Sequence, residues 1–144
     1  MELPKTAFLC SRKISAQSVL KCYDWAIEQR EAGNCVISGF HSPIEKDVFK
    51  YLSKGSQPII LALPRGLKKR LEPEIKQLLD QNRLLIVTPF DQSVTRVTKE
   101  TSWKRNELML ELADAVVVGH ENPEGELAQL LAANISLKTN YLSQ

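Results

Sequence analysis

Short continuous apolar segments recur along the chain, each followed by apolar residues at helical spacing, and this alternation constrains the fold more than any other feature. The apolar segments cover residues 6–10, 35–37, 58–63, 84–87 and 115–118. Because their apolar residues are continuous and do not alternate with polar ones, we expect strands that are buried on both faces, as in parallel sheets. Strands that alternate with helices predict an α/β fold of three layers, with a mostly parallel sheet of five or six strands.

The segments between these strands have the spacing and the start and stop signals of helices. We expect helices over residues 16–32, 43–55, 67–80, 103–113 and 124–133. Pro73 indicates either a kink in the third helix or its true start. Residues 91–101 have no periodicity, and a loop of that length is usually functional or mobile. Whether this loop is a lid, and whether residues 134–144 form an edge strand or a tail, are left open.

Length and composition fit one domain that needs no disulfide bonds. We assign residues 1–144 to a single domain, with its core over about 6–133. The chain has 19 basic and 17 acidic residues, so its overall charge does not indicate nucleic acid and a basic site must come from clustering. The three cysteines are expected to be free thiols. Without an apolar leader or membrane-spanning run, we expect a cytoplasmic protein.

The turn after the second apolar segment has the features of an anion-binding loop. Ser38 and Gly39 end the strand, and Ser42 opens a helix with Glu45 in its first turn. Gly39 allows a tight turn and the close approach of a ligand, while free N–H groups and the positive end of a helix attract anions. We expect the backbone of residues 38–42 to hold a phosphate; an ordinary strand-to-helix connection is the alternative.

Basic side chains also gather near the expected strand ends, outside which ligands bind in parallel sheets. They are Arg12, Arg65, Lys104 and Arg105, and Trp103 precedes the last pair. Arginine offers a planar fork that matches phosphate, and an aromatic ring stacks on bases unless it belongs to the core. We therefore expect a phosphate-bearing ligand, either single-stranded nucleic acid or a free nucleotide.

The sequence lacks the familiar motifs of nucleotide-dependent enzymes and of metal sites. There is no G-x-G-x-x-G after the first strand and no G-x-x-x-x-G-K-[ST]. His41 and His120 both follow expected strands, but no third ligand has a suitable spacing. We expect neither a metal nor a cofactor.

Four motifs between residues 6 and 133 resemble those of a known family. Cys10-Ser11-Arg12 is similar to a G-S-R that follows the first strand, and residues 38–45 (SGFHSPIE) are similar to S-G-x-A-x-G-I-D. Residues 103–107 (WKRNE) and 112–118 (LADAVVV) are similar to F-P-x-R-N-R and S-D-A-V-V-V. The chain thus resembles the Rossmann-like domain of the DNA-processing protein A (DprA/Smf) family, within the SLOG superfamily that also holds the LOG-type, lysine-decarboxylase-like proteins.

The resemblance implies a function, a set of site residues and partners. DprA proteins bind single-stranded DNA through a basic pocket on this domain and load the recombinase RecA, so a RecA-type recombinase is the implied partner. A homodimer is left open as a further partner. The residues implied around the DNA are Ser11, Arg12, Ser38, Gly39, Lys104, Arg105 and Asn106. Other positions at strand ends complete the expected ligand-binding set: Phe40, His41, Ser42, Arg65, Gly119 and Gly125.

Two other functions stay open beside a binding protein. LOG-type enzymes release the base of nucleoside monophosphates with P-G-G-x-G-T-x-x-E, and residues 122–127 keep Gly125 and Glu126 of that motif. Such a nucleotide N-glycosidase (phosphoribohydrolase) would use Glu45 or Glu126 as its acid–base carboxylate. A non-catalytic dimeric module that senses a nucleotide is the third possibility. We favour a binding protein over an enzyme.

Overall fold

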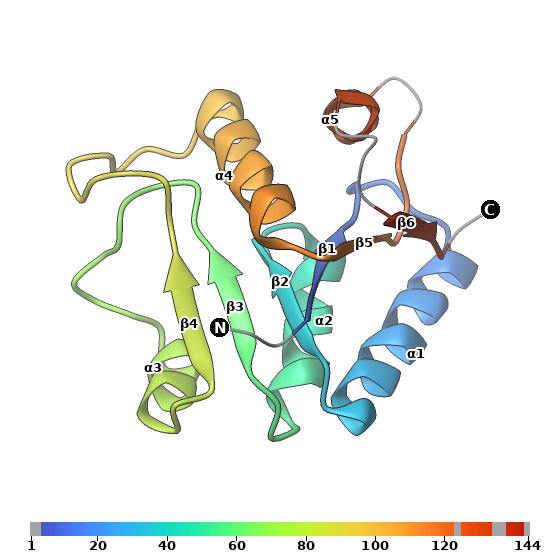
Figure 1. Ribbon diagram of the computed structural model, residues 1–144, viewed down its shortest axis with the longest axis horizontal. Helices are drawn as coiled ribbons and strands as arrows, with labels where there is room; N and C mark the ends of the chain where they lie inside the picture. The colour runs from blue at the N-terminus through green and yellow to red at the C-terminus, as the bar shows by residue number, and fades with distance from the viewer. Residues whose placement is uncertain (1–3, 123–124, 134–137, 143–144) are drawn as a thin grey trace.

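The computed structural model describes residues 4–122, 125–133 and 138–142 and shows one parallel sheet between two layers of helices (Figure 1). Its six strands lie in the order β4–β3–β2–β1–β5–β6, and all neighbouring strands are parallel. The predicted three-layer α/β fold is confirmed. The strands are β1 (Lys5–Leu9), β2 (Cys35–Ser38), β3 (Ile59–Ala62), β4 (Leu84–Val87), β5 (Ala115–Val118) and β6 (Lys138–Tyr141). The helices are α1 (Ala16–Ala32), α2 (Pro43–Ser53), α3 (Pro73–Asp80), α4 (Lys99–Leu112) and α5 (Glu126–Ala133).

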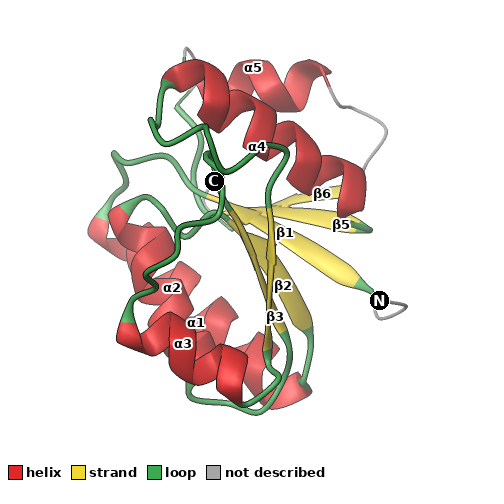
Figure 2. Ribbon diagram, turned by 90° about the vertical axis from the view of Figure 1, so that its left-hand side faces the viewer, coloured by secondary structure: helices red, strands yellow, loops and turns green. Residues whose placement is uncertain are grey.

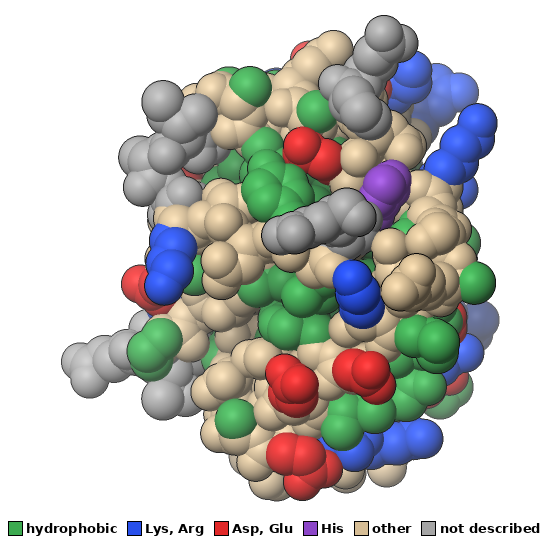
Figure 3. Space-filling model, turned by 90° about the vertical axis from the view of Figure 1, so that its right-hand side faces the viewer, with side chains coloured by type: hydrophobic (Ala, Val, Ile, Leu, Met, Phe, Trp, Pro, Cys, Tyr) green, Lys and Arg blue, Asp and Glu red, His purple; other side chains and the backbone are tan. Residues whose placement is uncertain are grey.

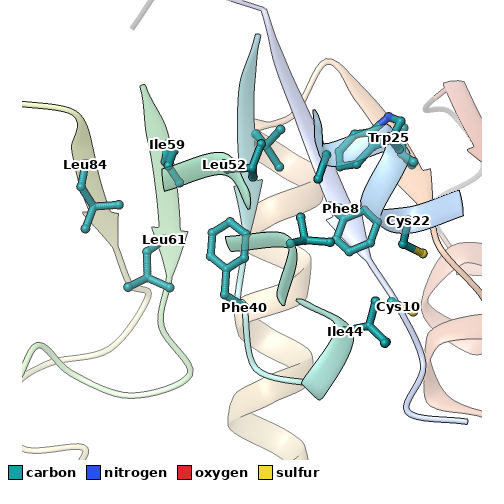
Figure 4. Packing of buried hydrophobic residues seen from close by; sticks show 14 of the residues in the cluster. Phe8, Cys10, Cys22, Trp25, Phe40, Ile44, Leu52, Ile59, Leu61 and Leu84 are labelled. Atoms are coloured by element: carbon teal, nitrogen blue, oxygen red, sulfur yellow. The ribbon is translucent and has the colours of Figure 1, made fainter. Parts of the chain in front are cut away.

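The central strand β1 is buried on both faces, as its continuous apolar sequence predicts. Helices α1, α2 and α3 cover one face of the sheet, and α4 and α5 cover the other (Figure 2). Phe8 points into the first layer, where its ring stacks on Trp25 of α1 with 5.0 Å between the centroids (Figure 4). Ala7 and Leu9 point into the second layer. Two apolar clusters therefore hold the sheet from both sides.

Local capping signals set the ends of the first two helices. Ser15 caps the start of α1, and Gly33 ends it in the left-handed conformation with φ 75°. Ser42 caps α2, and Glu45 completes a capping box. These starts agree with the sequence prediction.

The structure sets the starts of α3 and α4 and decides what the C-terminal segment forms. Helix α3 begins at Pro73, so this proline starts the helix and does not kink it. Helix α4 begins at Lys99 and not at residue 103, because Thr98 and Thr101 form a capping box, and the aperiodic loop is correspondingly shorter. Near the C-terminus, β6 pairs with β5, so this segment forms an edge strand and not a tail. Residue 124, the expected start of the last helix, lies outside the described residues.

Three further observations concern membrane spans, cysteines and surface charge. Within the described parts of the chain, no helix has the length and apolar character needed to cross a membrane. Cys10, Cys22 and Cys35 are buried free thiols, as predicted. On the face nearest α1 and β6, acidic and basic side chains are scattered among hydrophobic ones without a large patch of one sign (Figure 3).

Candidate functional site

A buried arginine packs against the turn that follows β2. Arg105 of α4 is only 4% exposed, and its Nη1 donates a hydrogen bond to the carbonyl oxygen of Ala62 at the end of β3 (3.2 Å). Its Nε donates to Oδ1 of Asn106 at 2.7 Å. A β-carbon at Gly39 would collide with this guanidinium group. A side chain at position 39 would therefore have to displace the guanidinium group of Arg105.

A buried carboxylate joins the ends of β1 and β2. Glu45 is 7% exposed; its Oε1 accepts hydrogen bonds from the backbone N–H of His41 (2.9 Å) and Ser42 (3.2 Å), and its Oε2 accepts one from Cys10 (3.1 Å). Burial raises the pKa of Glu45, while these N–H groups and the nearby charge of Arg105 act in the opposite direction. Glu45 and Arg105 therefore fix three strand ends relative to one another.

Three amides of the turn after β2 donate hydrogen bonds within the protein. The N–H of Phe40 donates to Oγ of Ser38 at 3.2 Å, and those of His41 and Ser42 donate to Glu45. Ser38 is fully buried, and Phe40 has a φ of 45°, a left-handed conformation that is uncommon for a bulky residue. Acceptors within the protein thus take the N–H groups of Phe40, His41 and Ser42, and the backbone phosphate site expected over residues 38–42 stays a prediction.

The ends of β1 and β5 are tied together by Ser11. Its N–H donates to the carbonyl oxygen of His120 at 2.8 Å, and its Oγ accepts a hydrogen bond from the N–H of Asn122 at 3.3 Å. A β-carbon at Gly119 would lie 2.7 Å from Sγ of Cys22 and 3.0 Å from Sγ of Cys10. The N–H of Gly125 donates to the carbonyl oxygen of Asn122 at 2.9 Å. In this structure Ser11, Gly119 and Gly125 shape the loops at this edge.

Positive charge converges on His41. Partial burial of its ring lowers the pKa of this histidine, and the charges of Arg105, Arg12 and Lys46 lower it further. Arg12, His41 and Lys46 are exposed, whereas Arg105 is buried behind them. The ends of β1 and β2, the first turn of α2 and helix α4 thus contribute cations to one region, which is the electrostatic requirement for an anion site.

The remaining basic and acidic candidates have different surroundings. Lys104 is exposed, with its Nζ 3.9 Å from Oε1 of Glu100. Arg65 is half-buried and donates from Nη1 to the carbonyl oxygen of Gly66 at 2.9 Å. Oε1 of Glu126 lies 3.8 Å from Nζ of Lys99. In the described ranges, no group of three or more His, Cys, Asp or Glu side chains could hold a metal ion.

Sequence reasoning missed a groove beside the turn. A cavity of about 650 Å³ lies between α2 and the segment that joins β3 to α3. Gly39, Phe40 and His41 form one end of it, and Lys46, Phe49 and Lys50 of α2 form one wall. The spacing of Lys46 and Lys50, one turn apart on α2, was the available signal, since residues four apart share a helix face.

Comparisons with known proteins place the fold. No family model matches the sequence, and no curated protein sequence matches it. Among solved structures, DNA processing protein A from Streptococcus pneumoniae superposes with a TM-score of 0.77 over 97% of this chain and 50% of its own, at 17% identity. DNA processing protein A from Helicobacter pylori, whose structure is described with a single-stranded DNA binding mode, gives a TM-score of 0.70 at 18% identity.

That superposition covers 92% of this chain and 62% of the Helicobacter pylori chain, so the present chain spans between half and two thirds of these two proteins. The molybdenum cofactor (Moco) carrier protein from Chlamydomonas reinhardtii is more distant, with a TM-score of 0.52 over 97% of this chain and 89% of its own, at 12% identity. At such identities structural likeness shows the fold and not the ligand. The chain therefore has the Rossmann-like fold of the DNA-processing protein A domain, which confirms the resemblance seen in its sequence.

Proposed function

We propose that this protein binds single-stranded nucleic acid through its phosphates at the carboxyl ends of the sheet strands. The observation that carries the proposal is the set of cations around the turn after β2: exposed Lys46 lines the same groove as His41, and the guanidinium group of the buried Arg105 lies against Gly39. Together with the exposed Arg12, these charges lower the pKa of His41. The net charge of the chain is only +2, so this clustering is local and not a consequence of overall charge. A nucleic-acid strand carries a negatively charged phosphodiester group at every nucleotide, and basic side chains bind these groups and release their counterions.

In this mechanism the exposed and the buried groups have different tasks. Arg12 and Lys46 contact phosphates and release counterions. Lys104, which precedes Arg105 in the sequence, does the same. Arg105 adds a positive charge from behind the turn and holds Gly39 in position. Glu45 keeps the end of β1, which carries Arg12, next to the turn after β2. The internal hydrogen bonds thus position the exposed cations and do not themselves bind the ligand.

The contacts of the two candidate carboxylates favour binding over glycosidic bond cleavage. Glu45 accepts three backbone hydrogen bonds and is buried, and Glu126 lies next to Lys99. An acid–base carboxylate must reach the reacting bond of the substrate. The likeness to a single-stranded DNA-binding relative supports the same choice. A cytoplasmic location, a homodimer and a RecA-type partner stay predictions, and of these only the RecA-type partner comes from the family resemblance.

Paired variants test the proposal. Fluorescence anisotropy with a labelled oligothymidylate would compare the wild type with Arg12→Ala/Lys46→Ala, and with Lys21→Ala/Lys76→Ala as a charge-matched control on α1 and α3. If Arg12 and Lys46 each neutralise one phosphate, the slope of log K against log salt concentration decreases in magnitude by about 1.4 in the first variant. The control should keep the wild-type slope. Equal slopes in all three proteins would remove Arg12 and Lys46 from the site.

A further inference from the structure

Two of the three buried thiols lie together at the ends of β1 and β5. Cys10 follows β1, Cys22 belongs to α1, and Gly119 follows β5. A β-carbon at Gly119 would lie 3.0 Å from Sγ of Cys10 and 2.7 Å from Sγ of Cys22. Both cysteines are part of the apolar cluster between α1 and the sheet (Figure 4). The two sulfur atoms therefore occupy the space that a side chain at position 119 would fill.

The two thiols also interact with each other directly. A hydrogen bond between them raises the pKa of Cys10 and lowers that of Cys22, and burial raises the pKa of Cys10 further. Cys35 lies in the apolar cluster on the other face of the sheet. The protein thus has two thiols in contact and a third thiol on the opposite side of the sheet.

A disulfide suits this buried pair better than a bound soft cation. A Cu(I) ion would need both sulfur atoms as thiolates, which leaves a net negative charge beside the buried Glu45. The N–H of Cys10 donates to Oε2 of that carboxylate at 3.1 Å, and the charge of Glu45 raises the pKa of Cys10. Oxidation to a disulfide removes both thiol protons and leaves no charge, which agrees with the apolar surroundings.

We propose that Cys10 and Cys22 are a modification site at which hydrogen peroxide forms an intramolecular disulfide, and that this bond weakens anion binding at the strand ends. The thiolate of Cys22 attacks one peroxide oxygen, the O–O bond breaks, and the hydroxide that leaves takes up the Cys22 proton as water. Cys22 is then a sulfenic acid. The sulfur of Cys10 attacks the sulfenic sulfur, the S–O bond breaks, and hydroxide leaves with the Cys10 proton as a second water. Two thiols are oxidised, and one peroxide is reduced to two waters.

Burial limits which oxidants can reach the pair. Cys22 is fully buried, and Cys10 is only 6% exposed. A neutral molecule as small as hydrogen peroxide can enter when the strand end opens locally, whereas the active site of an oxidoreductase protein cannot. We therefore expect slow oxidation that is limited by this opening.

The disulfide acts on the strand end that carries Arg12. The two sulfur atoms must move from hydrogen-bond contact to a bond of about 2.05 Å, so the end of β1 and helix α1 must approach each other. Hydrogen bonds from the N–H of Cys10 to Glu45 (3.1 Å) and from the N–H of Ser11 to the carbonyl oxygen of His120 (2.8 Å) hold that end in its present position. A shift strains both bonds and displaces Arg12. This consequence for anion binding rests on the proposed function.

Peptide mapping detects the modification without a binding assay. Trypsin places the three cysteines on separate peptides, residues 6–12, 22–30 and 31–46. After treatment with hydrogen peroxide and alkylation of the remaining thiols, the first two peptides should be joined by a disulfide. Cys35 should carry the alkyl group instead. Dithiothreitol should return all three cysteines to thiols by exchange with the disulfide.

Fluorescence anisotropy with a labelled oligothymidylate measures the consequence for binding. In the oxidised wild type, the slope of log K against log salt concentration should be smaller in magnitude by about 0.7 than in the reduced protein, as expected for one lost phosphate contact at Arg12. Cys22→Ala should form no disulfide and keep its slope after peroxide treatment. Cys35→Ala is the matched control, because it removes a buried thiol outside the pair and should respond like the wild type. Circular dichroism checks that each variant is folded.

The outcomes distinguish this inference from the function on which its second part rests. If peroxide-treated wild type contains no peptide that links Cys10 to Cys22, the inference is overturned, whether or not the protein binds nucleic acid. If the disulfide forms and the slope stays unchanged, its control of the anion site is refuted. If the reduced protein binds no oligothymidylate, the proposed function fails, and peptide mapping still decides whether the modification site exists.

Discussion

The contact between Gly39 and Arg105 gives the sharpest prediction for stability. Replacing Gly39 by alanine places a methyl group where the guanidinium lies. The guanidinium must then move away from the carbonyl oxygen of Ala62, its buried acceptor at 3.2 Å. A hydrogen bond from a charged donor contributes about 1.5–3 kcal/mol, so we expect Gly39→Ala to lower the free energy of unfolding by about 2 kcal/mol.

A double-mutant cycle separates this contact from other effects of the alanine. Arg105→Ala removes the same hydrogen bond and also the positive charge near the buried Glu45, so it should cost about 3 kcal/mol by itself. In that background the methyl group at position 39 meets no guanidinium, and Gly39→Ala should cost about 0.5 kcal/mol or less. The coupling energy between the two positions is thus about 1.5–2 kcal/mol.

Urea unfolding, followed by the fluorescence of Trp25 and Trp103, measures the free energy of unfolding of the wild type, both single variants and the double variant. Equal m-values check that all four proteins unfold in two-state transitions. Costs that add to within about 0.5 kcal/mol would refute the reasoning, because independent sites add to that accuracy. They would mean that the guanidinium group of Arg105 does not limit the residue at position 39.

The remaining predictions concern His41, Glu45 and Thr98. The pKa of His41 is lowered by partial burial and by its cationic neighbours, and a bound phosphate favours the protonated ring. Oligonucleotide affinity should therefore increase as the pH falls from about 7.5 to 5.5. His41→Asn should flatten that pH profile, and an unchanged profile would place His41 outside the site. By the same lowered pKa, the unfolded chain takes up the proton more readily, so His41 lowers stability as the pH falls below about 6.5, and urea unfolding of His41→Asn should lack this component. Glu45→Gln turns an amide NH₂ toward a backbone N–H donor and should cost about 1–3 kcal/mol in urea unfolding; a stability equal to the wild type would show that the three hydrogen bonds are dispensable. Thr98→Ala removes the cap of α4 and should cost about 1 kcal/mol, whereas no change in the unfolding midpoint would contradict the capping box.

Much of the fold could be predicted because its signals are local. The apolar run of β1 indicated a strand buried on both faces, and Phe8 and Ala7 do lie in separate clusters. The spacing of Ser42 and Glu45 indicated the start of α2. The start of α4 was missed because Thr98 and Thr101 read as loop residues, although together they cap a helix.

The candidate site was harder to predict because its chemistry is set by distant residues. Glu45 accepts a hydrogen bond from Cys10, which is 35 positions away, and no local pattern reveals that contact. Arg105 was identified as a phosphate ligand from its charge, but its burial against Gly39 depends on how α4 crosses the sheet. A sequence shows which side chains are basic; only packing decides which of them stay exposed to a ligand.

The central claim is that exposed cations at the strand ends bind the phosphates of a single strand. The most direct measurement is the affinity of the wild-type protein for an oligothymidylate as a function of salt concentration. With phosphate contacts from Arg12, Lys46 and Lys104, log K should fall against log salt with a slope of about −2, as about −0.7 is expected for each contact. Absence of binding at low salt, or an affinity that does not depend on salt, would contradict the account.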